Sequence, residues 1–173
     1  MPVYLHLTLP IGLALASQFK FRPLIWLVFL VIVLVHEAGH AVLLRRYRLP
    51  VLQVVLHGFG GECETSDWMT PWQSAVVAWG GVLAQALLLV VSSLSVSIGL
   101  WPSGAAASDL YVTLTSTNLL VAAFNLLPFR PLDGRQAWRL PWLAVLRVRH
   151  AWLAWRVARV RATTARTKRE RLH

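Results

Sequence analysis

Apolar residues are gathered into four long runs, and this pattern predicts a bundle of membrane-spanning helices. The runs cover about Val3 to Phe19, Pro23 to Leu44, Pro71 to Leu100 and Asp109 to Leu127. A helix of roughly 20 apolar residues, rising 1.5 Å per residue, is long enough to cross a bilayer. The first run has neither the basic leader nor the small-residue cleavage site of a signal peptide, so we expect a retained helix.

Residues 49–68, between the second and third runs, carry a different pattern. Val51, Val54 and Val55 are strand formers, and the turn-forming sequence HGFGG follows at residues 57–61. Such a segment predicts a β-hairpin or a looped strand. The expected fold is therefore an all-α integral membrane bundle of about four transmembrane helices with a small membrane-associated β-hairpin.

The composition agrees with a membrane location. Hydrophobic residues make up 57% of the 173 residues, above the roughly 45 to 50% of soluble domains. The net charge of +10, from 17 basic and 7 acidic residues, would suggest a nucleic-acid partner in a soluble protein. In a membrane protein the position of each charge matters more, so we expect a lipid bilayer and no nucleic acid as partners.

The basic residues also indicate an orientation. None occurs between Arg48 and Arg130, so the loop between the third and fourth runs is expected outside. The segment at Arg45 and the C-terminal tail are expected in the cytoplasm. With four spans both termini then face the cytoplasm, in what we interpret as a bacterial cytoplasmic membrane. Lys20 and Arg22 conflict with this topology, because it puts them outside.

The C-terminal part of the chain combines tryptophan with arginine. Trp138, Trp142, Trp152 and Trp155 are interspersed with basic residues, and the segment is too charged to span a membrane. It predicts a basic amphipathic segment at the cytoplasmic interface, with arginines on anionic headgroups. We therefore divide the chain into a transmembrane domain, residues 1–140, and a basic interfacial or cytoplasmic tail, residues 141–173.

The second apolar run contains the sequence HEAGH at residues 36–40. On a helix, His36 and His40 lie one turn apart on the same side, where two imidazoles can bind one cation. Zinc lowers the pKa of a bound water towards neutrality, and Glu37 beside it can take the proton and pass it to a leaving amine. An accidental grouping on a core helix is the alternative, but an unpaired charge within the membrane costs at least roughly 2.5 kcal/mol. The motif thus indicates amide hydrolysis.

The end of the fourth run carries a second polar segment, NLLPFRPLDG at residues 125–134. Pro128 and Pro131 must interrupt a helix, and unwound backbone at membrane depth is tolerated where it lines a cavity or is covered by protein. Asp133 is the natural third ligand for a site with two histidines, although it could instead cap the following helix. Asn125 could hydrogen-bond the scissile carbonyl or an oxyanion, or only satisfy the interrupted backbone.

Two pairs of glycines accompany these motifs. Gly80 and Gly81 let a neighbouring helix or a substrate approach closely, and helix packing is the simpler explanation. Gln85 brings a buried amide towards the same face, and its role stays open. Gly60 and Gly61 belong to the predicted hairpin, which could pair with an extended peptide by strand addition or be an ordinary cytoplasmic loop. In the first case Gly60, Gly61 and Gln85 would be substrate-positioning residues.

The motifs together resemble the site-2 protease family of intramembrane zinc metalloproteases, and its compact bacterial sporulation-type members most of all. They are HEAGH in one apolar run, a β-rich loop with paired glycines, a glycine-containing middle helix and N-x-x-P-x-x-P-L-D-G in a later run. The resemblance spans roughly Leu24 to Arg139. It implies one zinc ion per chain and the following roles: metal ligands His36, His40 and Asp133, general base Glu37, and substrate or oxyanion contact Asn125.

The resemblance implies zinc-dependent hydrolysis of a peptide bond in or near a transmembrane segment of an integral membrane protein, by a metalloprotease domain over residues 1–140. The alternatives are a zinc transporter and an inactive membrane scaffold with the same ligands. Transport predicts further polar residues on the outer side, and a scaffold has no need of Glu37. Two departures from the family's pattern are Gln85, where Gly-Pro followed by Asn is common, and Arg135 in place of a second glycine. The sequence indicates no oligomeric state.

Overall fold

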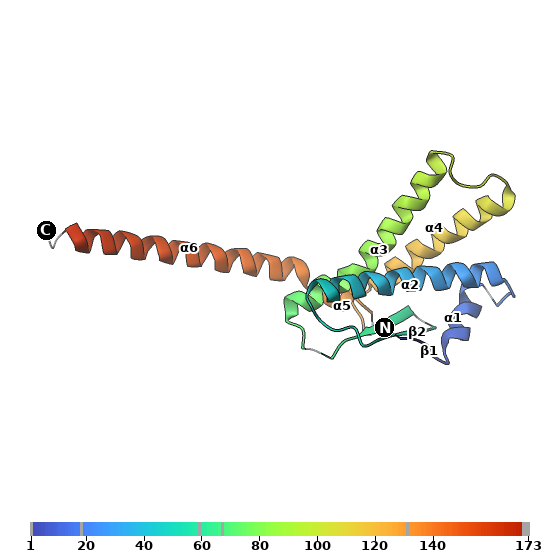
Figure 1. Cartoon of the computed structure of the whole chain (residues 1–173), viewed down its shortest axis with the longest axis horizontal. Coiled ribbons are helices and arrows are strands. Elements are labelled where there is room, and N and C mark those ends of the chain that lie inside the picture. Colours follow the sequence, from blue (N-terminus) through green and yellow to red (C-terminus); the bar gives the residue numbers. More distant parts are fainter. Residues whose placement is uncertain (1, 18, 59, 67, 131, 171–173) are drawn as a thin grey trace.

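Helix α2 is the element around which the others pack. The computed structural model describes residues 2–17, 19–58, 60–66, 68–130 and 132–170. The elements in chain order are β1 (Val3–Leu5), α1 (Leu9–Ala16), α2 (Pro23–Arg46), β2 (Gln53–His57), β3 (Gly60–Glu64), α3 (Pro71–Ser97), α4 (Ala105–Asn125), α5 (Gly134–Ala137) and α6 (Leu140–Glu170). Helix α2 contacts α1, both strands of the hairpin, α3 and α4. In Figure 1 the sheet lies on one side of α2, and α3 and α4 rise from the other side.

Local sequence signals set the ends of the long helices. Pro23 and Pro71 begin α2 and α3, where the missing N–H of proline costs nothing because the first turn lacks acceptors. Thr70 precedes α3 in a capping box: its hydroxyl accepts from the Gln73 N–H, and the Gln73 side chain accepts from the Thr70 N–H. Helix α4 ends at Asn125, before the predicted break at Pro128. The second predicted breaker, Pro131, lies outside the described residues.

The three strands form one sheet in the order β1-β2-β3. β2 and β3 are antiparallel, with Val55 opposite Glu62, which confirms the predicted hairpin. β1 runs parallel to β2, with Tyr4 opposite Val55, and this third strand was not predicted. β3 therefore forms one edge of the sheet.

The first predicted membrane span, Val3 to Phe19, is wrong. Val3–Leu5 is a strand, and α1 has only 8 residues, so that about 12 Å of helix is available where a bilayer needs about 30 Å. The apolar residues of this segment serve the sheet and the core instead, with Leu9 buried. The expected cytoplasmic position of the N-terminus depended on four spans and no longer follows once this span is removed.

Two helices in the described part of the chain are long and apolar enough to cross a membrane: α2, with 24 residues, and α3, with 27 residues. Helix α4 has 21 residues and packs against both, but it is less apolar. The expected bundle of about four transmembrane helices is therefore not confirmed: the described residues contain these two candidate spans, with α4 packed beside them.

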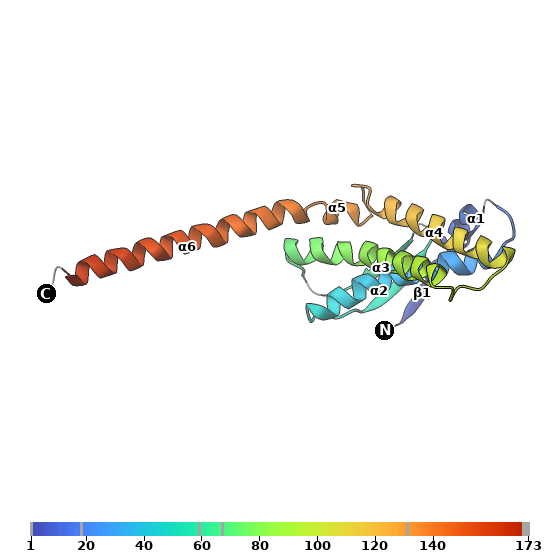
Figure 2. The ribbon, with the colours of Figure 1, turned by 90° about the horizontal axis from the view of Figure 1, so that it is seen from above.

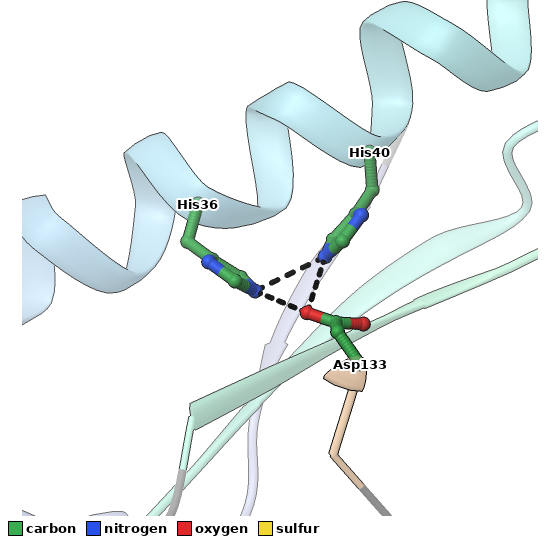
Figure 3. A group of neighbouring side chains, drawn as sticks. All are labelled: His36, His40 and Asp133. Carbon is green, nitrogen blue, oxygen red and sulfur yellow. Dashed lines mark hydrogen bonds and ion pairs between the residues drawn. The ribbon is translucent and has the colours of Figure 1, made fainter. Parts of the chain in front are cut away.

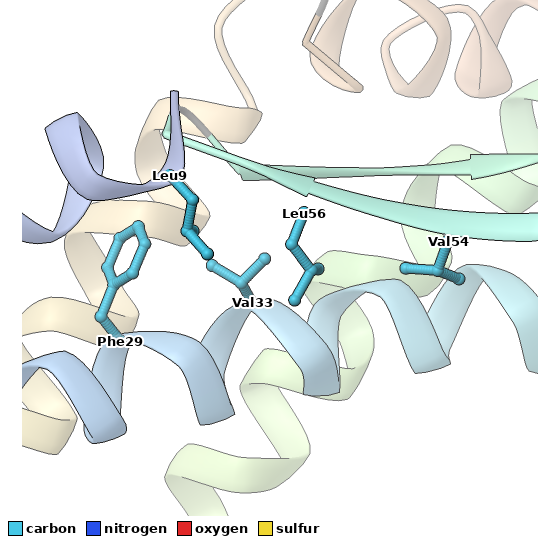
Figure 4. Packing of buried hydrophobic residues seen from close by; sticks show 5 residues of the cluster. All are labelled: Leu9, Phe29, Val33, Val54 and Leu56. Atoms are coloured by element: carbon cyan, nitrogen blue, oxygen red, sulfur yellow. The ribbon is translucent and has the colours of Figure 1, made fainter. Parts of the chain in front are cut away.

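A small apolar core joins the sheet to α2. It consists of Leu9, Phe29, Val33, Val54 and Leu56, contributed by α1, α2 and β2 (Figure 4). Because side chains alternate along a strand, Val54 and Leu56 face α2 together. Their partners on β3 are Cys63 and Gly61, and residues directly opposite each other share a face of the sheet. The same face of β3 is therefore turned towards α2.

Helices α2 and α3 approach each other closely at two glycines. A Cβ atom on Gly39 would collide with the backbone carbonyl of Gly80, and one on Gly80 would collide with the carbonyl of Gly39. Small residues at a helix crossing allow such an approach between membrane helices. Gly80 is therefore a packing residue, as the sequence indicated.

Helix α6 projects away from the rest of the molecule in both views (Figures 1 and 2). The prediction of an amphipathic segment is wrong, because its basic side chains surround the helix. Arg147 and Arg156 stand nine positions apart, which at about 100° per residue turns them to opposite sides. Stacking of Arg156 on Trp152 and of Arg159 on Trp155 follows the helical spacing of four residues.

Candidate metal centre

Three side chains from two distant segments converge on one point beside α2. His36 and His40 project from the same side of α2, and Asp133 reaches them from the link between α4 and α5 (Figure 3). The Asp133 Oδ2 atom lies 2.8 Å from His36 Nε2 and 3.1 Å from His40 Nε2, and the two Nε2 atoms are 3.1 Å apart. Among the described residues, this trio is a group of donors able to hold a metal ion.

The outer nitrogen of each histidine has its own partner. His36 Nδ1 lies 2.9 Å from Gln85 Oε1, and His40 Nδ1 lies 2.8 Å from the backbone carbonyl of Val77. Both partners are oxygen acceptors, so each Nδ1 carries the proton and donates it. Each neutral imidazole then turns an unprotonated Nε2 inward, which is the form that binds a metal.

Gln85, whose role the sequence left open, thus orients His36 from α3. Its own backbone carbonyl accepts a hydrogen bond of 2.8 Å from Asn118 Nδ2 on α4. Asn118 was not identified from the sequence as the residue that holds Gln85. Val77 could not have been identified, because the backbone carbonyl that contacts His40 is present in every residue type. A buried asparagine in the middle of an apolar helix was the available signal for Asn118.

Two tryptophans fix the segment that carries Asp133. Trp138 Nε1 donates to the carbonyl of Leu126 at 2.7 Å, and Trp79 Nε1 donates to the carbonyl of Ala137 at 3.0 Å. Gly134 lies so close to the Leu126 carbonyl that a Cβ atom would collide with it. The short helix α5 is therefore held against both α3 and the end of α4, at the distance that brings the carboxylate to the histidines.

Asp133 occupies the position preceding α5, but its side chain does not cap that helix. It turns to the histidines instead. Its Oδ2 atom is the one that lies 2.8 Å from His36 Nε2 and 3.1 Å from His40 Nε2, and an ionised carboxylate is the form in which aspartate binds a metal.

Glu37 lies directly beside this group, and its carboxylate is buried without a hydrogen-bond partner. The residue is 2% exposed, and neither Oε1 nor Oε2 has a donor within the described structure. Gly61 of β3 covers it so closely that a Cβ there would lie 2.5 Å from Glu37 Oε1. An unpaired buried carboxyl is costly, so a water molecule or a substrate is the expected partner.

Gly81 has the corresponding relation to His36. A Cβ on Gly81 would overlap the His36 imidazole. The two adjacent glycines of α3 therefore serve different purposes: Gly80 lets α2 approach, and Gly81 leaves room for a side chain of the site. The sequence could not separate these purposes, since both are met by the same residue type.

A cavity of about 260 Å³ opens onto these residues. Its lining joins the hairpin, α2, α3 and the α4–α5 link, and includes Glu37, His40, Asp133, Asn125 and Gly61. Asn125 is buried at the end of α4. Gly60 begins β3 opposite His57, at the turn of the hairpin. Five of the predicted site residues therefore surround one space, large enough for several water molecules or a short stretch of backbone: Glu37, His40, Gly61, Asn125 and Asp133.

The donor set fits a metal ion. Two imidazole nitrogens and one carboxylate oxygen are a set that catalytic zinc sites use, with a further position left open. With both Nδ1 protons already donated, three electron-rich atoms face one another within about 3 Å, an arrangement that a cation between them stabilises. His36, His40 and Asp133 are the residues that would hold it.

No family model matches the chain. In sequence it is 25% identical over 144 residues to a zinc metalloprotease of Methanocaldococcus jannaschii, covering 78% of this chain and 40% of that protein. It is 35% identical over 104 residues to a protein of Synechocystis that carries the name of a zinc metalloprotease, covering 59% of this chain and 27% of that protein. The chain thus spans less than half the length of these relatives.

The fold has a counterpart among solved structures. The site-2 protease from Methanocaldococcus jannaschii superimposes with a TM-score of 0.64 at 22% sequence identity, over 83% of this chain and 66% of that one. At this level of identity the likeness concerns the arrangement of the elements.

Proposed function

We propose that this chain belongs to the site-2 protease family of zinc metalloproteases and is an endopeptidase that cuts an integral membrane protein in or near a transmembrane segment. The observation that carries the proposal is Glu37. A metal trio alone is compatible with storage or transport. A buried carboxylate without a partner, placed between that trio and a strand edge, is what amide hydrolysis requires.

His36, His40 and Asp133 are the proposed ligands of one zinc ion per chain. Zinc in such a site acts as a Lewis acid towards a carbonyl and lowers the pKa of water towards neutrality. Gln85 and the Val77 carbonyl keep the two imidazoles in the binding tautomer. Their hydrogen bonds reduce the number of ring orientations available before the metal binds.

Glu37 is the proposed general base and acid. Its carboxylate accepts a proton from a water molecule at the wall of the cavity as the water oxygen bonds to the scissile carbonyl carbon. It later gives that proton to the amine nitrogen, which leaves as the C–N bond breaks. Gly61 lies over the carboxylate and lets a substrate backbone come within reach of it. Asn125, buried at the cavity wall, is proposed to hydrogen-bond the scissile carbonyl.

The edge of β3 supports a binding mode for the substrate. Val54 donates to Pro2, and Leu56 accepts from His6, so these two residues of β2 point their backbone groups towards β1. By alternation, Val55 points towards β3, where it is opposite Glu62. The backbone groups of Gly61 and Cys63 then point away from β2, and in the described chain no further strand covers them. We propose that an unwound substrate adds there as a strand, with Gly60 and Gly61 positioning it.

The membrane setting belongs to the same proposal. Helices α2 and α3 have the length and composition of spans, and Arg45 and Arg46 in the last turn of α2 favour a cytoplasmic location for that end. The cavity opens near this end, so water enters from the cytoplasm. A bacterial cytoplasmic membrane remains the proposed location, with residues 1–140 as the metalloprotease domain and residues 141–173 as a basic tail.

The test compares zinc content with cleavage in one preparation. The full chain is purified and placed in liposomes with single-span membrane proteins, as wild type, Glu37→Gln, Asp133→Asn and His150→Gln. We expect the wild type to hold one zinc ion and to cut, Glu37→Gln to hold zinc without cutting, and Asp133→Asn to lose zinc. His150 is exposed on α6, so its variant is the matched histidine control and should equal the wild type.

Cleavage by Glu37→Gln at the wild-type rate would contradict the assigned base. If the wild type cuts none of the membrane proteins but carries zinc into empty liposomes, the chain is a zinc transporter and the proposed protease function is refuted. Zinc binding without cleavage or flux would indicate the scaffold.

A further inference from the structure

The candidate cavity has a charge opposite to that of the whole chain. The protein carries a net charge of +10, yet the described residues lining the cavity include three carboxylates and no lysine or arginine: Glu37, Glu62 and Asp133. Asp133 belongs to the metal trio, and Glu37 is buried. Glu62 is exposed and has no assigned role.

Glu62 stands at the centre of the strand edge proposed to receive the substrate. It lies between Gly61 and Cys63, the two residues whose backbone groups point outward from the sheet. Since side chains alternate along a strand, its own side chain lies on the face opposite to the one that Gly61 and Cys63 turn towards α2. Its carboxylate makes no ion pair within the described residues, although it is close enough to Glu37 to act on it electrostatically.

We propose that Glu62 is a specificity-determining residue that selects substrates with lysine or arginine next to the scissile bond. The inference rests on the proposed function and names a property of its substrate. On an added strand, the residue across from Gly61 lies over Glu37, and the residue beside it lies across from Glu62. Cβ atoms of residues directly opposite in neighbouring strands are about 5 Å apart, within reach of an ion pair.

The chemistry of the partner supports this choice. Membrane proteins carry lysine and arginine just beyond the cytoplasmic ends of their spans. Arg45 and Arg46 favour that side of the membrane for the cavity as well. A single acidic group beside the edge strand therefore marks where a substrate's span ends, and it sets the register in which the strand is held.

The neighbouring Glu64 provides a matched control. It lies two positions along the same strand, on the same face, but it does not line the cavity. Its carboxylate accepts a hydrogen bond of 2.7 Å from Gln53 Nε2. A general effect of negative charge on the hairpin would act through both residues, and substrate selection would act through Glu62 alone.

The experiment scans a charge along a model substrate. Single-span peptides carry lysine, glutamine or glutamate at each position around the cytoplasmic end of the span. Binding is measured by photo-crosslinking to the inactive Glu37→Gln chain, and cleavage is measured with the zinc-loaded chain. Each measurement is repeated with Glu62→Gln, Glu62→Lys and Glu64→Gln, and zinc content and thermal unfolding verify that each variant folds.

We expect one position at which the lysine peptide binds and is cut about fivefold better than the glutamate peptide, as an opposed charge pair on neighbouring strands gives. Glu62→Gln should remove this preference, Glu62→Lys should reverse it, and Glu64→Gln should keep it. The inference is overturned if Glu62→Gln keeps the preference for the lysine peptide, or if the wild type shows no such preference at any position. In either case, cleavage by the zinc-loaded chain would still support the proposed protease function. A Glu62-dependent binding preference without any cleavage upholds the inference and refutes the proposed reaction.

Discussion

The Nε2 atoms of His36 and His40 lie 3.1 Å apart while the Nδ1 atoms of both rings donate hydrogen bonds elsewhere. The two rings therefore turn lone pairs towards each other and towards the Asp133 carboxylate. Such a contact is repulsive until a cation joins it. The affinity for the metal depends on how firmly the outer hydrogen bonds hold the rings.

Gln85→Leu is the first prediction, because it removes the acceptor that orients His36. Loss of an outer-shell partner costs about 10- to 100-fold in metal affinity, and we expect a decrease of that size. Competition with a chelator of known affinity measures it. Val77→Ala is the control, since it keeps the backbone carbonyl that orients His40; equal losses in both variants would refute the role given to Gln85.

Gly61→Ala and Gly81→Ala should separate the base from the metal. A methyl group on Gly61 pushes against the Glu37 carboxylate, so cleavage should fall by about 100-fold or more while zinc stays bound. A methyl group on Gly81 pushes against the His36 ring, so zinc itself should be lost. Zinc analysis and peptide cleavage on both variants provide the measurement, and identical phenotypes would contradict it.

Gly39→Ala should destabilise the crossing of α2 and α3. Its methyl group collides with the Gly80 carbonyl, which is backbone and cannot rotate away. Overpacking of this kind costs about 1 to 3 kcal/mol, to be read as a lower unfolding midpoint in detergent. Val42→Ala, a substitution at an exposed apolar position of the same helix, should leave the midpoint nearly unchanged. A midpoint of Gly39→Ala equal to that of the wild type would refute the close approach.

Cys63 gives a prediction about pH. Burial, followed by the charge of Glu37, raises the pKa of its thiol from 9.0 to about 11. At pH 8 the thiolate fraction in the folded chain is then about a hundredfold lower than in the unfolded chain, and alkylation by iodoacetamide should be slower by that factor. Since the folded state holds the thiol proton more tightly, this group's contribution to stability decreases as the pH rises from about 9 to 11.

Cys63 is the single cysteine of the chain, so the alkylation rate reports on one site. The denatured protein supplies the reference rate. Equal rates in the folded and denatured protein at pH 8 would show that the thiol is not shielded.

Local patterns predicted the parts of the site that depend on one element. His36, Glu37 and His40 share a helix, and helical spacing is enough to place them together. Asp133 was predicted from the chemical need for a third ligand. The structure adds what holds it there: two tryptophans whose N–H groups donate to backbone carbonyls. Partners of this kind cannot be read from residue types alone.

The first predicted span failed for a physical reason. Hydropathy shows that Val3 to Phe19 is apolar, but it does not show whether lipid or the rest of the protein covers these side chains. Tyr4 pairs with Val55, and Leu9 packs with residues of α2 and β2. These contacts join segments far apart in the sequence, so a short strand and a short helix gave the same signal as one spanning helix.

The His36–Asp133 contact joins positions separated by 97 residues. A metal held there is a reversible cross-link that closes most of the bundle into a ring. Since the free energy of closing a loop rises by only about 0.6 kcal/mol for each doubling of its length, this ring can be closed at moderate entropic cost. The free energy of metal binding then also contributes to the free energy of folding. In a cell starved of zinc, the first observable change should be a shorter lifetime of the protein, since the opened ring exposes the α4–α5 link to degradation.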